Sequence, residues 1–212
     1  MELTKAIRRY APIPIPHHVM SGLLVDYKEP NDKIRDLIAK GILERVTNGL
    51  YIAGAALEVD RPHPFLLANQ ILGPSYVSLE SALSYYNLIP ERVYTITSMT
   101  IKAAREYRTP RSTFTYTRLP LPYYSYGIQS VKLTEEQSVL LASPEKALID
   151  KIITTPGVQF RNKTNVLSYL EDDLRADIDS LKRLDWSSVT SWIPQAPKKR
   201  TLSLLLETLQ DA

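Results

Sequence analysis

Apolar residues recur at intervals of three and four near the start of the chain, and prolines divide them into three groups. This spacing places the apolar residues of each group on one face of a helix. The predicted helices cover residues 2–9, residues 18–27 and a segment that begins at residues 30–32. The proline-rich segment APIPIPH stops the first, because proline lacks a backbone N–H, and KEPND breaks the chain after the second. Gly41 is a suitable C-terminal stop for the third. The apolar stripe of the third helix consists of Ile34, Leu37, Ile38 and Ile42.

A β-hairpin is predicted directly after the third helix. Asn48-Gly49 is the strongest short hairpin signal, because a type I′ turn needs positive φ at both central residues. The flanking segments ILERV and GLYIAG are rich in residues that favour strands. Three helices and a hairpin in this order are typical of a winged helix-turn-helix. We therefore expect a DNA-binding domain over residues 1–55, with the hairpin as its wing.

The pattern changes after a linker at residues 55–64. Ser78 and Ser143 are candidate N-caps of two further helices, and Pro144 suits the first position of the second. The final third of the chain has helical spacing. We expect an α+β fold in which residues 65–212 form a larger α/β domain with a short mixed sheet and a helical C-terminal third. Strand patterns occur at residues 93–100, 112–119, 126–133 and 138–143.

The composition excludes several kinds of site and partner. The 212 residues include no cysteine, which excludes disulfides, cysteine nucleophiles and iron–sulfur clusters. No apolar run approaches the roughly 18 residues of a membrane span, and residues 1–12 lack a signal-peptide core. We expect a cytoplasmic protein without a membrane partner. The net charge of +3 permits a polyanionic partner but does not require one.

Residues 73–100, GPSYVSLESALSYYNLIPERVYTITSMT, resemble the signature segment of the AbiEi family of antitoxins from type IV toxin–antitoxin systems. LIAKGILERVTNGLYI resembles the family's helix and wing, and ASPEKALIDKI resembles a later helix. The resemblance covers nearly the whole chain. It implies a winged-helix domain joined to an antitoxin domain, repression of the protein's own operon, and a paired toxin of the nucleotidyltransferase type. Direct contact between toxin and antitoxin is not required in this class.

The third helix and the wing carry the candidate DNA contacts. Arginine and lysine can neutralise phosphates or read guanine, while threonine and asparagine can bond to phosphate oxygens. Residues 1–52 hold eight Lys or Arg against six Asp or Glu, a low excess for a tight DNA binder. The alternative is a winged helix used for protein contacts, with solvated charges. The candidate contacts are Lys33, Arg35, Lys40, Arg45, Thr47 and Asn48.

A second basic stretch lies in the larger domain, where residues 92–118 hold six Lys or Arg and one acid. Neighbouring aromatic residues could stack on bases. Alternatively, Phe114 and Tyr116 face a sheet core and the cations are ordinary surface residues, and the alternation FTYT favours this for the aromatics. The candidate basic face consists of Lys102, Arg105, Arg108, Arg111 and Arg118.

Catalytic and metal chemistry is not expected. His17 and His18 are adjacent and diverge on a helix, so they are poor co-ligands. The chain has no glycine-rich phosphate loop and no Gly-x-Ser-x-Gly elbow. We expect no catalytic residues, no metal and no cofactor. The expected function is an antitoxin that binds operator DNA. The alternatives are a plain winged-helix regulator with a dimerising or ligand-sensing second domain, and a protein-binding module.

Overall fold

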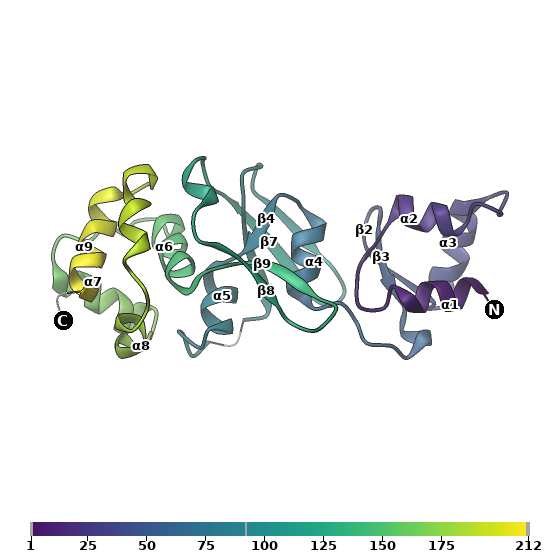
Figure 1. The fold of residues 1–212 in the computed structure, drawn as a ribbon, viewed down its shortest axis with the longest axis horizontal. Coiled ribbons are helices and arrows are strands. Elements are labelled where there is room, and N and C mark those ends of the chain that lie inside the picture. The colour runs from purple at the N-terminus through teal and green to yellow at the C-terminus, as the bar shows by residue number, and fades with distance from the viewer. Residues whose placement is uncertain (1, 92, 211–212) are drawn as a thin grey trace.

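A computed structural model describes residues 2–91 and 93–210. The protein is a mixed α+β molecule, elongated along one axis (Figure 1). The N-terminal helices and a small sheet lie at one end, a larger sheet lies in the middle, and the C-terminal helices lie at the other end. No helix of the described chain has the length and apolar character needed to cross a membrane.

The N-terminal unit has the element order helix, strand, helix, helix, strand, strand. Its three strands form an antiparallel sheet in the order β1-β3-β2. Apolar side chains from the helices and from one face of this sheet, including Ile7, Met20 and Ile34, form a separate buried cluster. The elements are α1 (Glu2–Arg9), β1 (Ile15–Pro16), α2 (His17–Leu23), α3 (Pro30–Ala39), β2 (Leu43–Thr47) and β3 (Leu50–Ala53).

Local signals account for most of this unit. Pro30 occupies the first turn of α3, and Gly41 takes the left-handed backbone (φ +67°) that ends the helix. The second helix ends at Leu23, earlier than predicted. Strand β1 was not predicted, because it lies within the proline-rich segment. Pro16 is tolerated there because β1 is an edge strand of the sheet.

The central sheet has six strands in the order β6-β7-β5-β4-β9-β8 and is mixed. Its β5–β7 and β4–β9 pairs are parallel, and its other pairs are antiparallel. Four strands match predicted segments, whereas the short β4 and the charged β6 were not predicted. The strands are β4 (Ser75–Val77), β5 (Thr95–Thr100), β6 (Arg105–Arg108), β7 (Thr113–Arg118), β8 (Ile128–Lys132) and β9 (Ser138–Ala142).

Helices cover both faces of this sheet. α4 (Pro64–Ile71) lies on the face of Tyr116, whose hydroxyl donates to the Ala68 carbonyl (2.6 Å). α5 (Leu79–Tyr85) and α6 (Pro144–Thr154) lie on the face of Tyr76, whose hydroxyl donates to Asp150. The sheet and its helices share one buried cluster with the C-terminal helices. These helices are α7 (Lys163–Ser168), α8 (Ile178–Lys182) and α9 (Lys199–Gln210).

The buried hydrophobic residues divide the chain into two parts. One cluster contains residues between 7 and 57, and the other contains residues between 65 and 209. Residues 58–63 connect the two units (Figure 1).

Candidate nucleic-acid interface

The cations of α3 and of its C-cap residue Lys40 lie outside the buried face of the helix. Ile34 and Leu37 pack into the N-terminal core, and this fixes the rotation of the helix. Arg35 and Lys40 are exposed, whereas Lys33 is half-buried beside Tyr27, with its ammonium 5.6 Å from the ring centroid. The helical rotation of about 100° per residue places Lys33 and Lys40 along one edge of the exposed face and Arg35 along the other, with Asp32 and Asp36 between them. Arg35 and Lys40 are the more accessible cations.

Two aspartates of the same helix pair with these cations. Lys33 and Lys40 both contact Asp36, at 2.9 and 2.8 Å, and Arg35 contacts Asp32 at 2.8 Å. Hydrogen bonds from Lys40 and Lys33 hold the pKa of Asp36 below its usual range, and the bond to Asp36 raises the pKa of Lys33. Exposed ion pairs contribute little to stability, so these cations can exchange an aspartate for a phosphate. The two aspartates nevertheless offset part of the positive charge of these three cations.

The β2–β3 hairpin, the predicted wing, carries the remaining candidate contacts. Arg45 and Asn48 are exposed and Thr47 is half-buried. Arg45 has no ion-pair partner within residues 2–91 and 93–210. Arg45 is therefore an exposed cation of the hairpin without an acidic partner in the described residues.

The predicted type I′ turn is wrong. Gly49 has positive φ (+78°), but Asn48 is not in the left-handed region. Strand β2 has an irregular register, in which Arg45 pairs with Tyr51 and Thr47 with Leu50. The extra residue, Val46, relaxes the register, so one glycine with positive φ is enough to close the hairpin.

The start of α2 lies beside the wing turn, which the sequence did not indicate. The backbone N–H of His17 donates to the Gly49 carbonyl (2.8 Å), and its ring nitrogen Nδ1 lies 3.5 Å from the hydroxyl oxygen of Tyr51. His17 and His18 are both exposed. The surface beside the hairpin thus includes the imidazole of His17 in addition to the predicted residues.

The predicted basic face of the larger unit is not one surface. All five cations are exposed, but strand register separates them. Arg118 pairs with Thr100 at one end of the sheet, and Arg105 lies near the same end. Arg108 and Arg111 lie at the other end, and residue alternation places Arg105 and Arg108 on opposite faces. Lys102 follows the end of β5 near Arg118.

The aromatic residues of this stretch are buried, as their alternation favours. Phe114 and Tyr116 are 1% and 2% exposed. Tyr107 packs edge-to-face on Tyr116. These rings belong to the sheet core and are not available to stack on bases.

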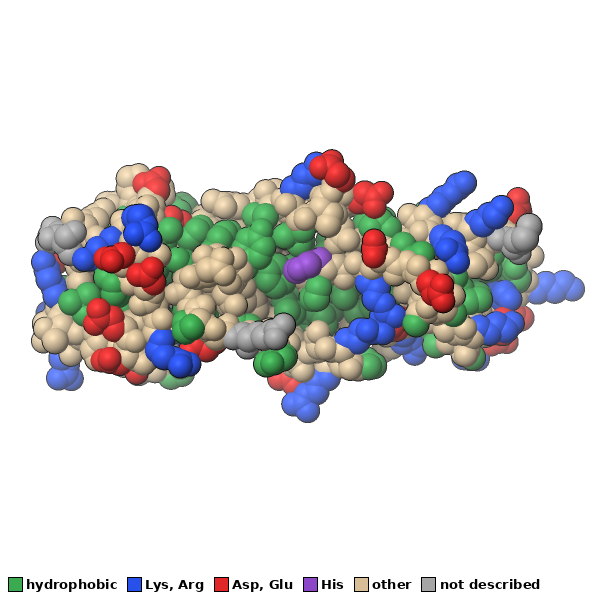
Figure 2. Space-filling model, turned by 90° about the horizontal axis from the view of Figure 1, so that it is seen from below, with side chains coloured by type: hydrophobic (Ala, Val, Ile, Leu, Met, Phe, Trp, Pro, Cys, Tyr) green, Lys and Arg blue, Asp and Glu red, His purple; other side chains and the backbone are tan. Residues whose placement is uncertain are grey.

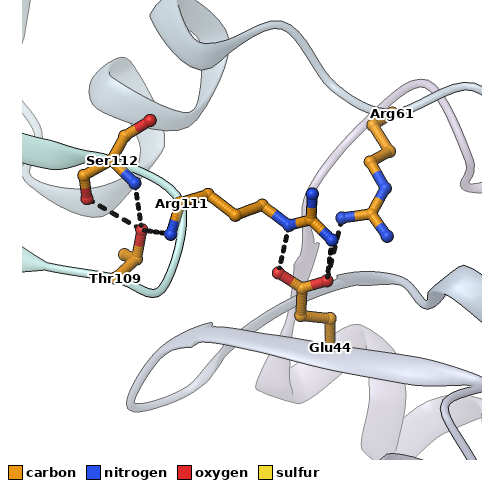
Figure 3. Close-up of polar contacts among 5 residues, drawn as sticks. All are labelled: Glu44, Arg61, Thr109, Arg111 and Ser112. Carbon is orange, nitrogen blue, oxygen red and sulfur yellow. Dashed lines mark hydrogen bonds and ion pairs between the residues drawn. The ribbon is translucent and has the colours of Figure 1, made fainter. Parts of the chain in front are cut away.

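Arg111 binds the N-terminal unit. Its guanidinium donates through Nε to Oε1 of Glu44 (2.9 Å) and through Nη2 to Oε2 (3.3 Å). Arg61 of the connecting segment donates to the same carboxylate (2.9 Å), and Figure 3 shows Glu44 between the two arginines. The hydroxyl of Thr109 accepts from the backbone N–H of Ser112 (3.1 Å) and shapes the turn that carries Arg111. Burial favours the neutral form of Glu44, but hydrogen bonds from Arg111 and Arg61 outweigh it and lower its pKa.

A buried ionic cluster was also missed. Lys146 and Asp150 lie one turn apart on α6, and both side chains are fully buried. The ammonium nitrogen of Lys146 lies 3.1 Å from Oδ1 of Asp150. The Asp150 carboxylate also accepts hydrogen bonds from Tyr76 (2.9 Å), Ser78 (2.8 Å) and Tyr123 (3.0 Å). Ser78 stands at the N-cap of α5 as predicted, but its hydroxyl makes this bond and does not cap the helix. The cluster is closed to solvent, so it joins β4, α5 and α6 and is not an open site.

A second basic area lies at the start of α9, in a hollow of about 630 Å³. The ammonium of Lys198 donates two of its three N–H groups to the carbonyls of Ile152 (2.8 Å) and Thr155 (2.7 Å). Figure 1 places α9 at the opposite end of the molecule from α3, so the two areas are not one surface. The cations lining the hollow are Arg161, Lys198, Lys199 and Arg200.

Residues 2–91 and 93–210 contain no group of three or more His, Asp or Glu placed to hold a metal ion. No protein-family model matches the chain, and no curated protein matches it either.

Proposed function

We propose that the protein is the antitoxin of a type IV toxin–antitoxin system, and that its N-terminal unit binds operator DNA and represses its own operon. The order of elements in residues 2–53 supports a winged-helix interpretation, with α3 as recognition helix and the β2–β3 hairpin as wing. The AbiEi resemblance of residues 73–100 supports the antitoxin role. Both activities place the protein in the cytoplasm.

One observation carries the DNA-binding proposal. Arg35 of α3, Lys40 at the C-cap of α3 and Arg45 of the β2–β3 hairpin are all exposed and lie on neighbouring elements. A helix and a hairpin side by side can contact a major groove and the adjoining phosphates together. Thr47 and Asn48 extend this surface with neutral hydrogen-bonding groups.

The test is operator binding at several salt concentrations, using the DNA directly upstream of the reading frame. Replacing Arg35 and Arg45 by alanine removes two phosphate contacts. Each contact contributes about 0.9 to the slope of log affinity against log salt, so the slope should fall by about 2. Electrophoretic mobility shift or fluorescence anisotropy gives this slope directly.

Arg105 and Arg118 provide the matched control, because they are exposed arginines at the far end of the central sheet. The double replacement of these two by alanine removes the same charge and should leave the salt slope unchanged. Equal losses in both double variants would contradict a contact localised to α3 and the wing.

The antitoxin role is tested by co-expression with the neighbouring nucleotidyltransferase gene, and rescue of growth supports it. The plain winged-helix regulator is the second candidate, and the separate core of the N-terminal unit is compatible with both candidates. It predicts the same operator binding without rescue.

A further inference from the structure

A cavity of about 340 Å³ lies between the two units. Its apolar walls come from Ile52 on β3, Leu67 on α4 and Phe114 on β7. Ile52 is 2% exposed, lies outside the N-terminal core cluster and lines the cavity together with residues of the second unit. The volume is in the range of small-molecule sites, which often form between domains. Figure 2 shows hydrophobic side chains gathered at the surface in the middle of the molecule, next to cationic ones.

The polar rim of this cavity carries a net positive charge. Arg61 and Arg111 both line it, with the single carboxylate of Glu44 between them (Figure 3). Two guanidinium groups have ten N–H donors in total, and the bonds to Glu44 use three of them. Within the described residues neither arginine has a second acidic partner. One positive charge and several N–H donors are therefore left for a ligand.

We propose that this cavity binds a small organic monocarboxylate with an apolar body. The apolar body contacts Ile52, Leu67 and Phe114, and the carboxylate accepts hydrogen bonds from the free N–H groups of Arg61 and Arg111. Guanidinium and carboxylate pair in a bidentate geometry that adds both affinity and direction. A single negative charge balances the rim, whereas a doubly charged phosphate would exceed it.

The chemistry distinguishes this ligand from a neutral apolar molecule. A neutral alcohol supplies one uncharged hydroxyl acceptor, whereas a carboxylate supplies two charged oxygens that match the guanidinium fork. Hydrogen bonds to an ionised partner are roughly twice as strong as neutral ones. Octanoate and 1-octanol share the apolar chain and differ in the carboxylate, so they form a matched pair of probes, and 3-phenylpropanoate tests an aromatic body.

The experiment is isothermal titration calorimetry of the full chain with each probe, without DNA, so its result is independent of the proposed function. Octanoate or 3-phenylpropanoate should bind with one site per chain, and octanol should bind at least about tenfold more weakly. Arg111→Gln should weaken carboxylate binding by about tenfold or more. Leu67→Trp fills the cavity, leaves the charges in place and should abolish binding.

Arg108→Gln is the control, because Arg108 is exposed on the same hairpin and pairs with Glu106 outside the cavity. It should bind the carboxylates as the unchanged protein does. Circular dichroism establishes that each variant is folded before titration. Equal affinity for octanoate and octanol, binding that survives Leu67→Trp, or no binding of either carboxylate up to millimolar concentration would each overturn the proposal.

Discussion

Asp150 is the acceptor on which the buried cluster depends. It takes hydrogen bonds from three hydroxyls and an ion pair from Lys146, all without solvent. Asp150→Ala leaves a buried ammonium without its counter-ion, which costs about 3–5 kcal/mol. Lys146→Met leaves a carboxylate that keeps its three hydroxyl donors, so the expected loss is smaller, about 1–3 kcal/mol. Urea unfolding measures both.

Lys132→Met is the control for this comparison, because Lys132 also pairs with an acid but is exposed. It should leave the free energy of unfolding nearly unchanged. A larger loss for Lys146→Met than for Asp150→Ala would show that the ammonium, not the carboxylate, holds the cluster together.

His63 gives the protein a pH dependence near neutrality. Its Nδ1 accepts the backbone N–H of Phe65 (3.1 Å) and caps α4, which requires an unprotonated nitrogen. Burial lowers the pKa of His63 below its usual 6.5. The unfolded chain therefore binds the proton more strongly, and this contribution to stability is present above pH 6.5 and is lost as the pH falls below it. His63→Asn keeps a capping oxygen and does not titrate.

Unfolding by urea between about pH 7.5 and pH 5.5 checks this expectation. The free energy of unfolding of the unchanged protein should fall over this interval by more than that of His63→Asn. Parallel pH profiles would assign the dependence to other groups.

The burial of individual charges could not be read from the sequence. Lys146 and Asp150 are spaced by four residues on a helix, the same spacing as the exposed pair Lys40 and Asp36. Glu44 and Arg111 are 67 residues apart, and no local pattern relates them. By contrast, the capping role of Ser143 was predictable, because serine is a preferred N-cap residue. Its hydroxyl accepts the backbone N–H three residues later.

At the scale of elements, Gly54 permits the close approach of the turn after α3 to the end of β3. A Cβ at Gly54 would lie 2.0 Å from the Gly41 carbonyl oxygen, a backbone atom that cannot rotate away. Gly54→Ala forces the end of β3 away from the turn after α3, and we expect a loss of about 1–3 kcal/mol. Thermal or urea unfolding followed by far-UV circular dichroism measures it.

Gly22 is the matched control, since it lies within α2 and an added Cβ would meet nothing within 4 Å. Gly22→Ala should raise stability by roughly 0.5–1 kcal/mol through helix propensity. Unchanged stability in Gly54→Ala would show that the two backbone segments are free to separate.

Element prediction succeeded where local chemistry decides and failed where tertiary contacts decide. The bounds of α1 and the start of α3 follow from apolar spacing and proline. Strand β6 was read as a basic stretch, because its pairing with β7 and not its own pattern makes it a strand. We expected the five cations around β6 on one face, but the strand register places them at both ends of the sheet and on opposite faces. Strand β3 is buried at every position, a signal that both of its faces are covered.

At the scale of the whole molecule, the two cores meet at a small junction formed by Glu44, Arg61 and Arg111 around the cavity. A polar junction of this kind couples two units weakly. Both tryptophans, Trp186 and Trp192, belong to the larger core. Tryptophan fluorescence therefore reports the larger unit, whereas far-UV circular dichroism reports both.

This arrangement predicts that Gly54→Ala separates the two probes. The N-terminal unit should melt first, giving circular dichroism an early transition, while the fluorescence midpoint stays at its original value. If both probes shift together, the junction joins the units into one cooperative body. Glu44→Gln in the Gly54→Ala background should then restore the separation, because it removes the carboxylate that holds both arginines. The result decides whether a change at the cavity can reach α3 and the wing, since coupling between sites requires that their units share an equilibrium.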